Sequence, residues 1–206
     1  PFASGFWRLG LSVPVLGVIA LLTAPTARRG GTAFRARDHG LALAAGLSFA
    51  ADILCWHSAI FFTSVTDATL IANLAPVFVA LTSAVVFNER FGQRFGFGFT
   101  LSLAGAGALV LQKAGGAPPV DRFFGDLLSL GAASTYAIYM MLIGQLRQRH
   151  SAQTVMFYTS LVSGLILLPV ALLSGQSLMP TSLYGFAIIL GIALVAHVGG
   201  QGLLTY

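Results

Sequence analysis

The sequence predicts an all-α membrane protein, a polytopic bundle of helices that cross the bilayer. Only 8% of the 206 residues are charged and 56% are hydrophobic, whereas roughly 25% of an ordinary soluble domain is charged. The apolar residues recur in runs of about 18 to 24, the length that a helix needs to cross the hydrocarbon core. Backbone hydrogen bonds must be satisfied within each segment, and the short alternating stretches of a β-barrel are missing, so helices fit best.

Seven apolar runs divide the chain, and each is expected to form one membrane helix. They cover residues 6–23, 39–61, 67–87, 94–112, 124–145, 154–174 and 182 to the end. The links between them are short, which indicates a single packed bundle. In the fifth run, Gly125, Ser129, Ala133 and Ala137 recur every four residues and form a ridge of small side chains that another helix can approach closely.

Basic residues in the links predict the orientation of the helices. The links 24–38, 88–94 and 146–153 contain eight arginines, whereas the links that alternate with them contain only Lys113 and Arg122. By the positive-inside rule, the three arginine-rich links face the cytoplasm. The net charge of +5 is therefore explained by orientation in the plasma (inner) membrane and not by nucleic acid.

Neither a cofactor nor enzymatic chemistry is expected from the sequence. The single cysteine, Cys55, lies within an apolar run, and the four histidines show no paired ligand spacing, so we expect no disulfide and no metal site. Residues 161–164 (LVSG) lack the first glycine of a rhomboid-like protease motif, and the last run has no lysine for a retinal Schiff base. An intramembrane enzyme or a retinal protein is thus disfavoured.

The second and seventh runs resemble each other when the chain is shifted by 145 positions. The shift places Asp52 on His197 and Trp56 on Gln201. Each helix therefore has two polar residues four positions apart, which lie on one face of the helix. The two helices are expected to cross in opposite directions, and inverted repeats are typical of transporters that bind substrate near the midplane. Chance similarity between two apolar helices is the competing explanation.

The segment 66–111, TDATLIANLAPVFVALTSAVVFNERFGQRFGFGFTLSLAGAGALVL, resembles the EamA-type drug/metabolite transporter superfamily. The matching positions are Pro76 in the middle of the third run, Glu89 at its cytoplasmic end, and Gly98 and Gly105 in the next helix. The stretches 125–146 (GDLLSLGAASTYAIYMMLIGQL) and 196–206 (AHVGGQGLLTY) are similar to the second repeat of that family.

This resemblance implies ten helices in two inverted five-helix repeats. Residues 1–113 would be the first repeat without its first helix, residues 114–123 an extracytoplasmic linker, and residues 124–206 the second repeat without its last two helices. The resemblance implies alternating-access transport of small metabolites, amino acids or drug-like compounds, with a small-molecule substrate and the lipid bilayer as partners. Proton coupling, export and a homodimer stay open, as does a structural membrane subunit that transports nothing.

Polar and aromatic residues within the spans are expected to line the substrate cavity. They are Asp52, Trp56, Asn73, Tyr136, Tyr139, His197 and Gln201. A carboxylate in hydrocarbon must face a partner or a watery cavity, and imidazole changes protonation near neutral pH, so Asp52 or His197 is expected to carry a coupling proton. Structural roles are the alternative: the aromatic rings can pack in the core, and Asn73 can bind carbonyls freed by Pro76.

Two further charged residues are expected to be structural. Glu89 lies beside Arg90 and Arg94, so it is expected to fix the loop between the third and fourth runs rather than to bind substrate. Arg8 follows Trp7 near the outer edge of the first run, and we expect its side chain to snorkel toward the membrane surface.

Overall fold

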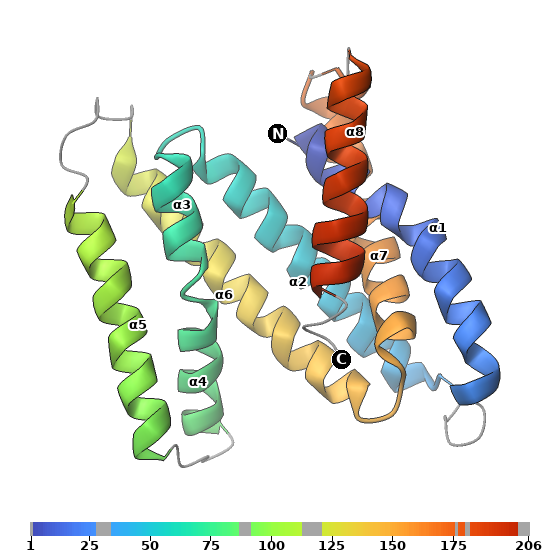
Figure 1. Cartoon of the computed structure of the whole chain (residues 1–206), viewed down its shortest axis with the longest axis horizontal. Coiled ribbons are helices and arrows are strands. Elements are labelled where there is room, and N and C mark those ends of the chain that lie inside the picture. The colour runs from blue at the N-terminus through green and yellow to red at the C-terminus, as the bar shows by residue number, and fades with distance from the viewer. Residues whose placement is uncertain are drawn as a thin grey trace. The chain divides into compact units, whose positions relative to one another are not determined.

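The computed structural model describes residues 2–27, 34–86, 92–112, 121–175, 177–179 and 182–201 and contains only helices within these ranges. In chain order they are α1 (Phe2–Ala27), α2 (Ala36–Ala59), α3 (Val65–Ala72), α4 (Ala75–Val86), α5 (Gln93–Gln112), α6 (Arg122–Arg147), α7 (Ala152–Leu173), α8 (Leu183–Gly191) and the π-helical η1 (Ile192–Gln201) (Figure 1). Each predicted run coincides with one helix or a consecutive pair, which confirms the all-α prediction.

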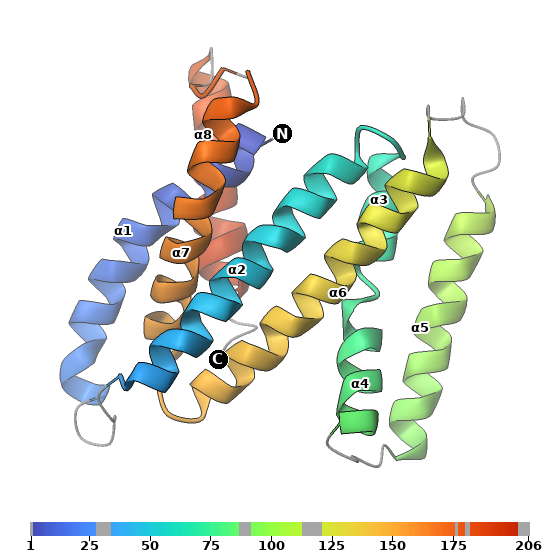
Figure 2. The same ribbon diagram turned by 180° about the vertical axis from the view of Figure 1, so that it is seen from behind.

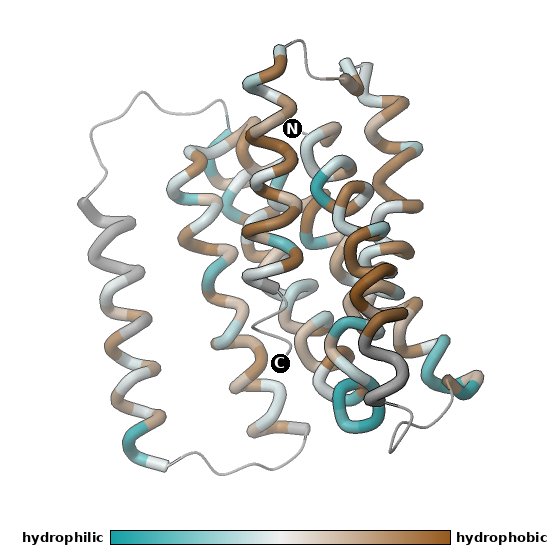
Figure 3. The backbone as a smooth tube through the Cα atoms, turned by 45° about the vertical axis from the view of Figure 1, so that its right-hand side comes forward, coloured by the Kyte–Doolittle hydropathy of each residue, from teal (hydrophilic) through white to brown (hydrophobic). Residues whose placement is uncertain are grey.

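Six helical stretches of the described chain are long and apolar enough to cross a membrane. They are Phe2–Leu22, Ala36–Ala59, Val65–Val85, Arg122–Arg147, Ala152–Leu173 and Leu183–Gly200. Figure 3 shows apolar positions recurring along the helices. Large apolar side chains such as Leu22, Leu165 and Leu173 are exposed, as expected where a surface faces lipid rather than water. The protein is therefore a multi-pass helical membrane protein.

The helices form two compact units, and we describe each by itself. The first unit contains residues 1–50 and 139–206, and the second contains residues 51–138. The long helices α2 and α6 contribute residues to both units. The predicted division into two inverted repeats is a separate matter, which the unit boundaries do not address.

The first unit is held together by packing along α7. Helix α1 lies side by side with α7 in both views (Figures 1 and 2) and also contacts α8 and η1. The side chains of Leu9, Leu16, Met156 and Leu167 are buried in this unit. These apolar contacts form the core of the unit, and the polar residues described below pack against it.

Helices α2 and α7 approach each other closely at Gly46. A Cβ atom added to Gly46 would lie 2.5 Å from Cβ of Val162, so the site has no room for a larger residue. The hydroxyl of Ser163 donates to the carbonyl oxygens of Gly46 at 2.7 Å and Thr159 at 2.8 Å. Small residues at such crossings allow close backbone packing in membranes, where helices gain no hydrophobic drive to associate.

The second unit has a similar close approach on α6. The predicted ridge of small residues, Gly125, Ser129, Ala133 and Ala137, is buried along its whole length. A Cβ added to Gly125 would lie 2.7 Å from the backbone nitrogen of Thr63. The ridge was expected to admit another helix, whereas its close contact at Gly125 is with the turn that follows α2.

The third predicted run is interrupted rather than kinked. Helix α3 ends at Ala72 and α4 begins at Ala75, so Pro76 occupies the second position of α4. Because the first turn of a helix has unpaired N–H groups, a proline is tolerated there without loss of a hydrogen bond. The break at Asn73 and Leu74 precedes the proline, whereas the sequence had indicated a continuous helix bent by it.

Candidate functional site

Buried polar and aromatic side chains of the first unit meet around His197, and we call His197, Ser160, Phe49, Tyr139 and Arg8 the central cluster. Only 2% of His197 is exposed. Its Nε2 atom lies 2.8 Å from the hydroxyl oxygen of Ser160, and the tautomer of the ring decides which of the two groups donates. The cluster is thus built around a hydrogen bond between two side chains far apart in the sequence.

Aromatic rings form one wall of the central cluster. The Phe49 ring stacks on Tyr139 with a centroid distance of 4.7 Å and on His197 at 5.7 Å. Tyr139 and Phe49 are among the largest fully buried side chains of the described chain. Ligand sites in proteins combine apolar and aromatic walls with a few placed polar groups, and this arrangement has that composition.

The π-helical segment η1 positions His197. Helix α8 runs directly into η1 at Ile192, and π-helical turns within α-helices occur frequently at functional sites. Ala193 and His197, four residues apart, are both buried, whereas Val195 between them is exposed. The polar side chain therefore faces into the unit from an otherwise apolar helix.

The Nδ1 atom of His197 is buried and has no hydrogen-bond partner among the described residues. An unsatisfied buried polar atom costs about 1–3 kcal/mol, and most buried polar groups in folded proteins avoid that cost. Such an atom calls for an explanation by a water, an ion, a ligand or a functional role. The central cluster thus contains a buried polar atom that the described residues leave unsatisfied.

Arg8 belongs to the central cluster, so the expectation that it snorkels to the membrane surface was wrong. Its guanidinium carbon lies 5.8 Å from the centroid of the Phe49 ring, and attraction between a cation and the face of a ring holds it there. The signal that could have revealed this role is a charge within an apolar run, which is functional by default. Because Arg8 lies near the start of the run, its position suggested a place at the membrane surface instead.

The structure places four of the predicted cavity residues in the second unit. Asp52, Trp56 and Tyr136 are half-buried there, and the Trp56 ring lies edge-on to His57 at 5.0 Å. Asn73 ends α3 and is exposed, and its side chain makes no hydrogen bond within the described chain. Tyr139 and His197 belong to the first unit, where they are brought together by Phe49.

The remaining predicted positions are described only in part. Glu89 lies outside the described residues, and Gln201 is the last residue of η1, with its side chain outside the described part. A Cβ added to Gly98 or Gly105 would meet no described atom within 4 Å. The roles that the resemblance assigns to these residues stay predictions.

A second polar group of the first unit lies where α2 begins and α6 ends, and the sequence did not reveal it. We call Phe34, Asp38, His150 and Tyr158 the basic-end cluster, because arginines surround it. Asp38 Oδ2 lies 3.2 Å from His150 Nε2, and 4% of each side chain is exposed. The same oxygen accepts the backbone N–H of Arg35 at 3.0 Å. The Phe34 ring covers this pair, with centroid distances of 4.1 Å to His150 and 4.7 Å to Tyr158.

The second unit has its own charged group, which we call the acidic-end cluster: Thr63, Asp67, Arg122 and Asp126. Arg122 lies 3.5 Å from an Asp67 oxygen and 3.8 Å from an Asp126 oxygen. The Thr63 hydroxyl donates to Asp126 at 2.9 Å. Within the described residues, no group of three or more histidine, cysteine or acidic side chains could hold a metal ion.

Comparison with known proteins identifies the family. The EamA-like transporter family matches residues 1–111 and 123–206. Two curated relatives, each called pseudopaline exporter CntI and found in Pseudomonas aeruginosa strains UCBPP-PA14 and PAO1, are 26% identical over 172 residues. That alignment covers 84% of this chain and 58% of each relative, so the chain spans less than two thirds of their length. The chain belongs to the EamA-like transporter family.

Proposed function

We propose that this protein transports a small organic molecule across the plasma membrane by alternating access, with residues 1–113 and 124–206 as its two inverted repeats. The observation that carries the proposal is the buried His197, whose Nδ1 atom has no partner within the described residues, in a chain of a transporter family. In inverted-repeat transporters, substrate binds near the bilayer midplane. His197 lies within the span Leu183–Gly200, three residues before its end.

The central cluster supplies the chemistry for a polar metabolite. His197 and Ser160 can each donate and accept a hydrogen bond, and Phe49 and Tyr139 offer aromatic surface for an apolar part of the molecule. Because the two relatives are named as exporters, we propose that the compound moves out of the cell. With the arginine-rich links in the cytoplasm, export runs from their side to the opposite side.

Proton coupling is the second part of the proposal. An imidazole and a carboxylate within membrane spans are the groups that can gain or lose a proton during a transport cycle. His197 in the first unit and Asp52 in the second are the candidates. Asp52→Asn keeps the shape of the side chain and removes the titrating group, so it separates coupling from folding.

The test is flux of a panel of metabolites, amino acids and drug-like compounds in proteoliposomes, with and without a pH gradient. Ser160→Ala removes the hydroxyl that contacts His197 and is expected to lower flux about tenfold, the factor for a hydrogen bond worth about 1.4 kcal/mol. Ser163→Ala is the matched control, because Ser163 lies one turn further along α7 and bonds only backbone carbonyls in the described structure. We expect its flux to stay close to that of wild type.

Three results would change this view. Equal flux in the Ser160→Ala and Ser163→Ala variants would remove the central cluster from the substrate path. A gradient dependence that survives Asp52→Asn would exclude Asp52 as the coupling residue. If the folded protein moves no compound of the panel, a structural membrane subunit becomes the better explanation.

A further inference from the structure

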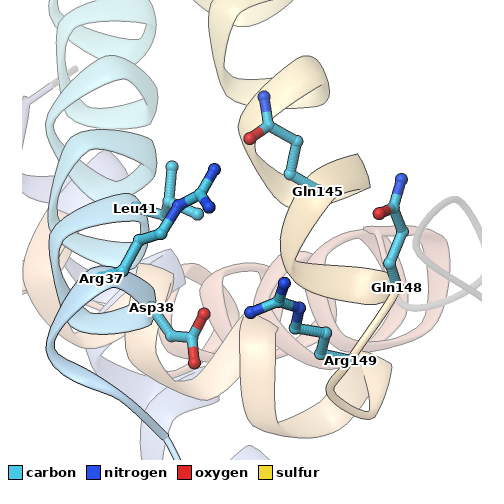
Figure 4. A pocket seen from close by; sticks show the side chains of 6 residues that line it. All are labelled: Arg37, Asp38, Leu41, Gln145, Gln148 and Arg149. Atoms are coloured by element: carbon cyan, nitrogen blue, oxygen red, sulfur yellow. The ribbon is translucent and has the colours of Figure 1, made fainter.

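A cavity of about 70 Å³ opens between the start of α2 and the end of α6 in the first unit. Its lining residues are Arg37, Asp38, Leu41, Gln145, Gln148 and Arg149 (Figure 4). The first three come from the first turns of α2, and the others from the last turn of α6 and the turn that follows it. The volume is larger than the roughly 30 Å³ that one water molecule occupies in the liquid, so the cavity has room for a larger polar group.

Two guanidinium groups line this cavity together with the carboxylate of Asp38. Figure 4 shows Arg149 extending toward the side of the cavity where the Asp38 carboxylate lies, and Arg37 lying beside Leu41. Neither guanidinium takes part in an ion pair or a hydrogen bond with another described residue. The charge of Arg149 acts on Asp38, so the cavity holds two guanidinium charges against one carboxylate.

The carboxylate in the cavity wall is already engaged. Asp38 is the only acidic residue that the sequence places in the first unit. Its Oδ2 atom accepts the Arg35 N–H and lies against His150, and the side chain is buried. Asp38 is thus shared between His150, the Arg35 N–H and the charge of Arg149, and the two arginines leave the cavity with one positive charge in excess.

We propose that this cavity binds the phosphate group of an anionic membrane lipid. The planar guanidinium fork matches two oxygens of a phosphate group, and the side-chain amides of Gln145 and Gln148 add donors. The positive end of the α2 helix dipole points to the same place. Phosphate is thus the ligand chemistry that the lining groups recognise.

The position of the cavity favours a lipid as the source of the phosphate. Both arginines belong to links that are predicted to be cytoplasmic, and the cytoplasmic leaflet carries the anionic lipids. A lipid bound in this way would tie the start of α2 to the turn after α6, independently of any transported substrate.

The experiment uses the purified, delipidated protein in detergent and compares phosphatidylglycerol with phosphatidylcholine of the same acyl chains. Native mass spectrometry counts bound lipid, and thermal unfolding reports stabilisation. We expect wild type to prefer phosphatidylglycerol, and the double variant Arg37→Gln/Arg149→Gln to bind it about tenfold or more weakly, since two charge-assisted contacts are lost. The matched control is Arg35→Gln/Arg94→Gln, which removes two exposed arginines that do not line the cavity.

Inorganic phosphate and glycerol 1-phosphate distinguish the source of the anion. If neither displaces phosphatidylglycerol at millimolar concentration, the ligand is the lipid. If either one displaces it and stabilises wild type but not the double variant, the cavity takes a soluble phosphate and the lipid assignment is overturned. Equal binding of both lipids, or equal loss in the two double variants, overturns the site altogether. Because lipid binding is measured without flux, none of these results bears on the transport proposal.

Discussion

The basic-end cluster of the first unit and the acidic-end cluster of the second are built alike but with opposite charge balance. In the first, one carboxylate, Asp38, is surrounded by His150 and several arginines. In the second, one guanidinium, Arg122, lies between the two carboxylates of Asp67 and Asp126. The predicted topology assigns the links of the two clusters to opposite sides of the bilayer, and the positive-inside bias accounts for such a contrast in charge. The balance of charges at a helix end therefore indicates which side of the membrane that end faces, whereas the packing between helices does not.

The two clusters also differ in burial, and this difference predicts how sensitive each is to mutation. In the basic-end cluster only 4% of the Asp38 and His150 side chains is exposed. In the acidic-end cluster 42% of the Arg122 side chain and 34% of the Asp126 side chain are exposed. Water can therefore replace a lost partner of Arg122 or Asp126, whereas only 9% of the Asp67 side chain is exposed. Ion pairs that stay wet contribute little to stability.

The largest effect is expected for a substitution at Gly125, which contacts the backbone next to the acidic-end cluster. Gly125→Ala would place a methyl group 2.7 Å from the backbone nitrogen of Thr63 and 3.0 Å from the carbonyl carbon of Phe62. Because backbone atoms cannot rotate away, we expect a loss of about 3 kcal/mol in the free energy of unfolding, measured in mixed detergent micelles.

Gly144→Ala on the same helix is the control for Gly125→Ala, since a Cβ there meets no described atom within 4 Å. We expect it to be neutral or slightly stabilising, because alanine favours a helix over glycine. Equal effects of the two substitutions would mean that the contact between Gly125 and Thr63 does not hold the second unit together.

Removal of the only carboxylate tests the basic-end cluster. Asp38→Ala leaves the N–H of Arg35 and the His150 ring without their buried acceptor, and we expect a loss of about 2 kcal/mol. Asp121→Ala is the comparison, because that exposed carboxylate accepts only the backbone N–H of Phe124 among the described residues, and its loss should cost clearly less. A smaller loss for Asp38→Ala than for Asp121→Ala would contradict the contrast in burial between the two clusters.

The smallest effect is expected for Arg122→Gln. Both ion pairs of Arg122 are longer than 3.4 Å and the guanidinium is partly exposed, so the loss should be below about 1 kcal/mol. The difference from wild type should shrink further in 0.5 M salt, where screening acts within roughly 4 to 5 Å. A loss that exceeds that of Asp38→Ala, or one that salt leaves unchanged, would reverse the order of the two clusters.

The helices were predictable because each apolar run carries its own evidence. The fifth run was predicted at 124–145 and forms α6 from Arg122 to Arg147, since composition alone decides whether a segment spans hydrocarbon. The break before Pro76 was not predicted, because a proline in a run indicates a kink and a new helix start equally well.

The sites were less predictable because they depend on contacts between distant parts of the chain. His197 was identified as a polar residue in an apolar helix, but its partner Ser160 was not, because hydroxyls are common in membrane spans. Asp38 and His150 lie in two separate links, and the sequence gives no reason to pair them. Arg8 was assigned to the membrane edge by its position in the run, whereas its contact with Phe49 depends on the packing of α1.

The π-helical geometry of η1 gives the helix that carries His197 a second way to move. In a π-helix each N–H bonds a carbonyl five residues back instead of four. A change of these bonds back to the α pattern would turn the end of the segment about its own axis and would carry His197 away from Ser160. Because an α-helix rises more per residue than the wider π-helix, the same change would also lengthen the segment, so the orientation of His197 is coupled to the position of the helix end.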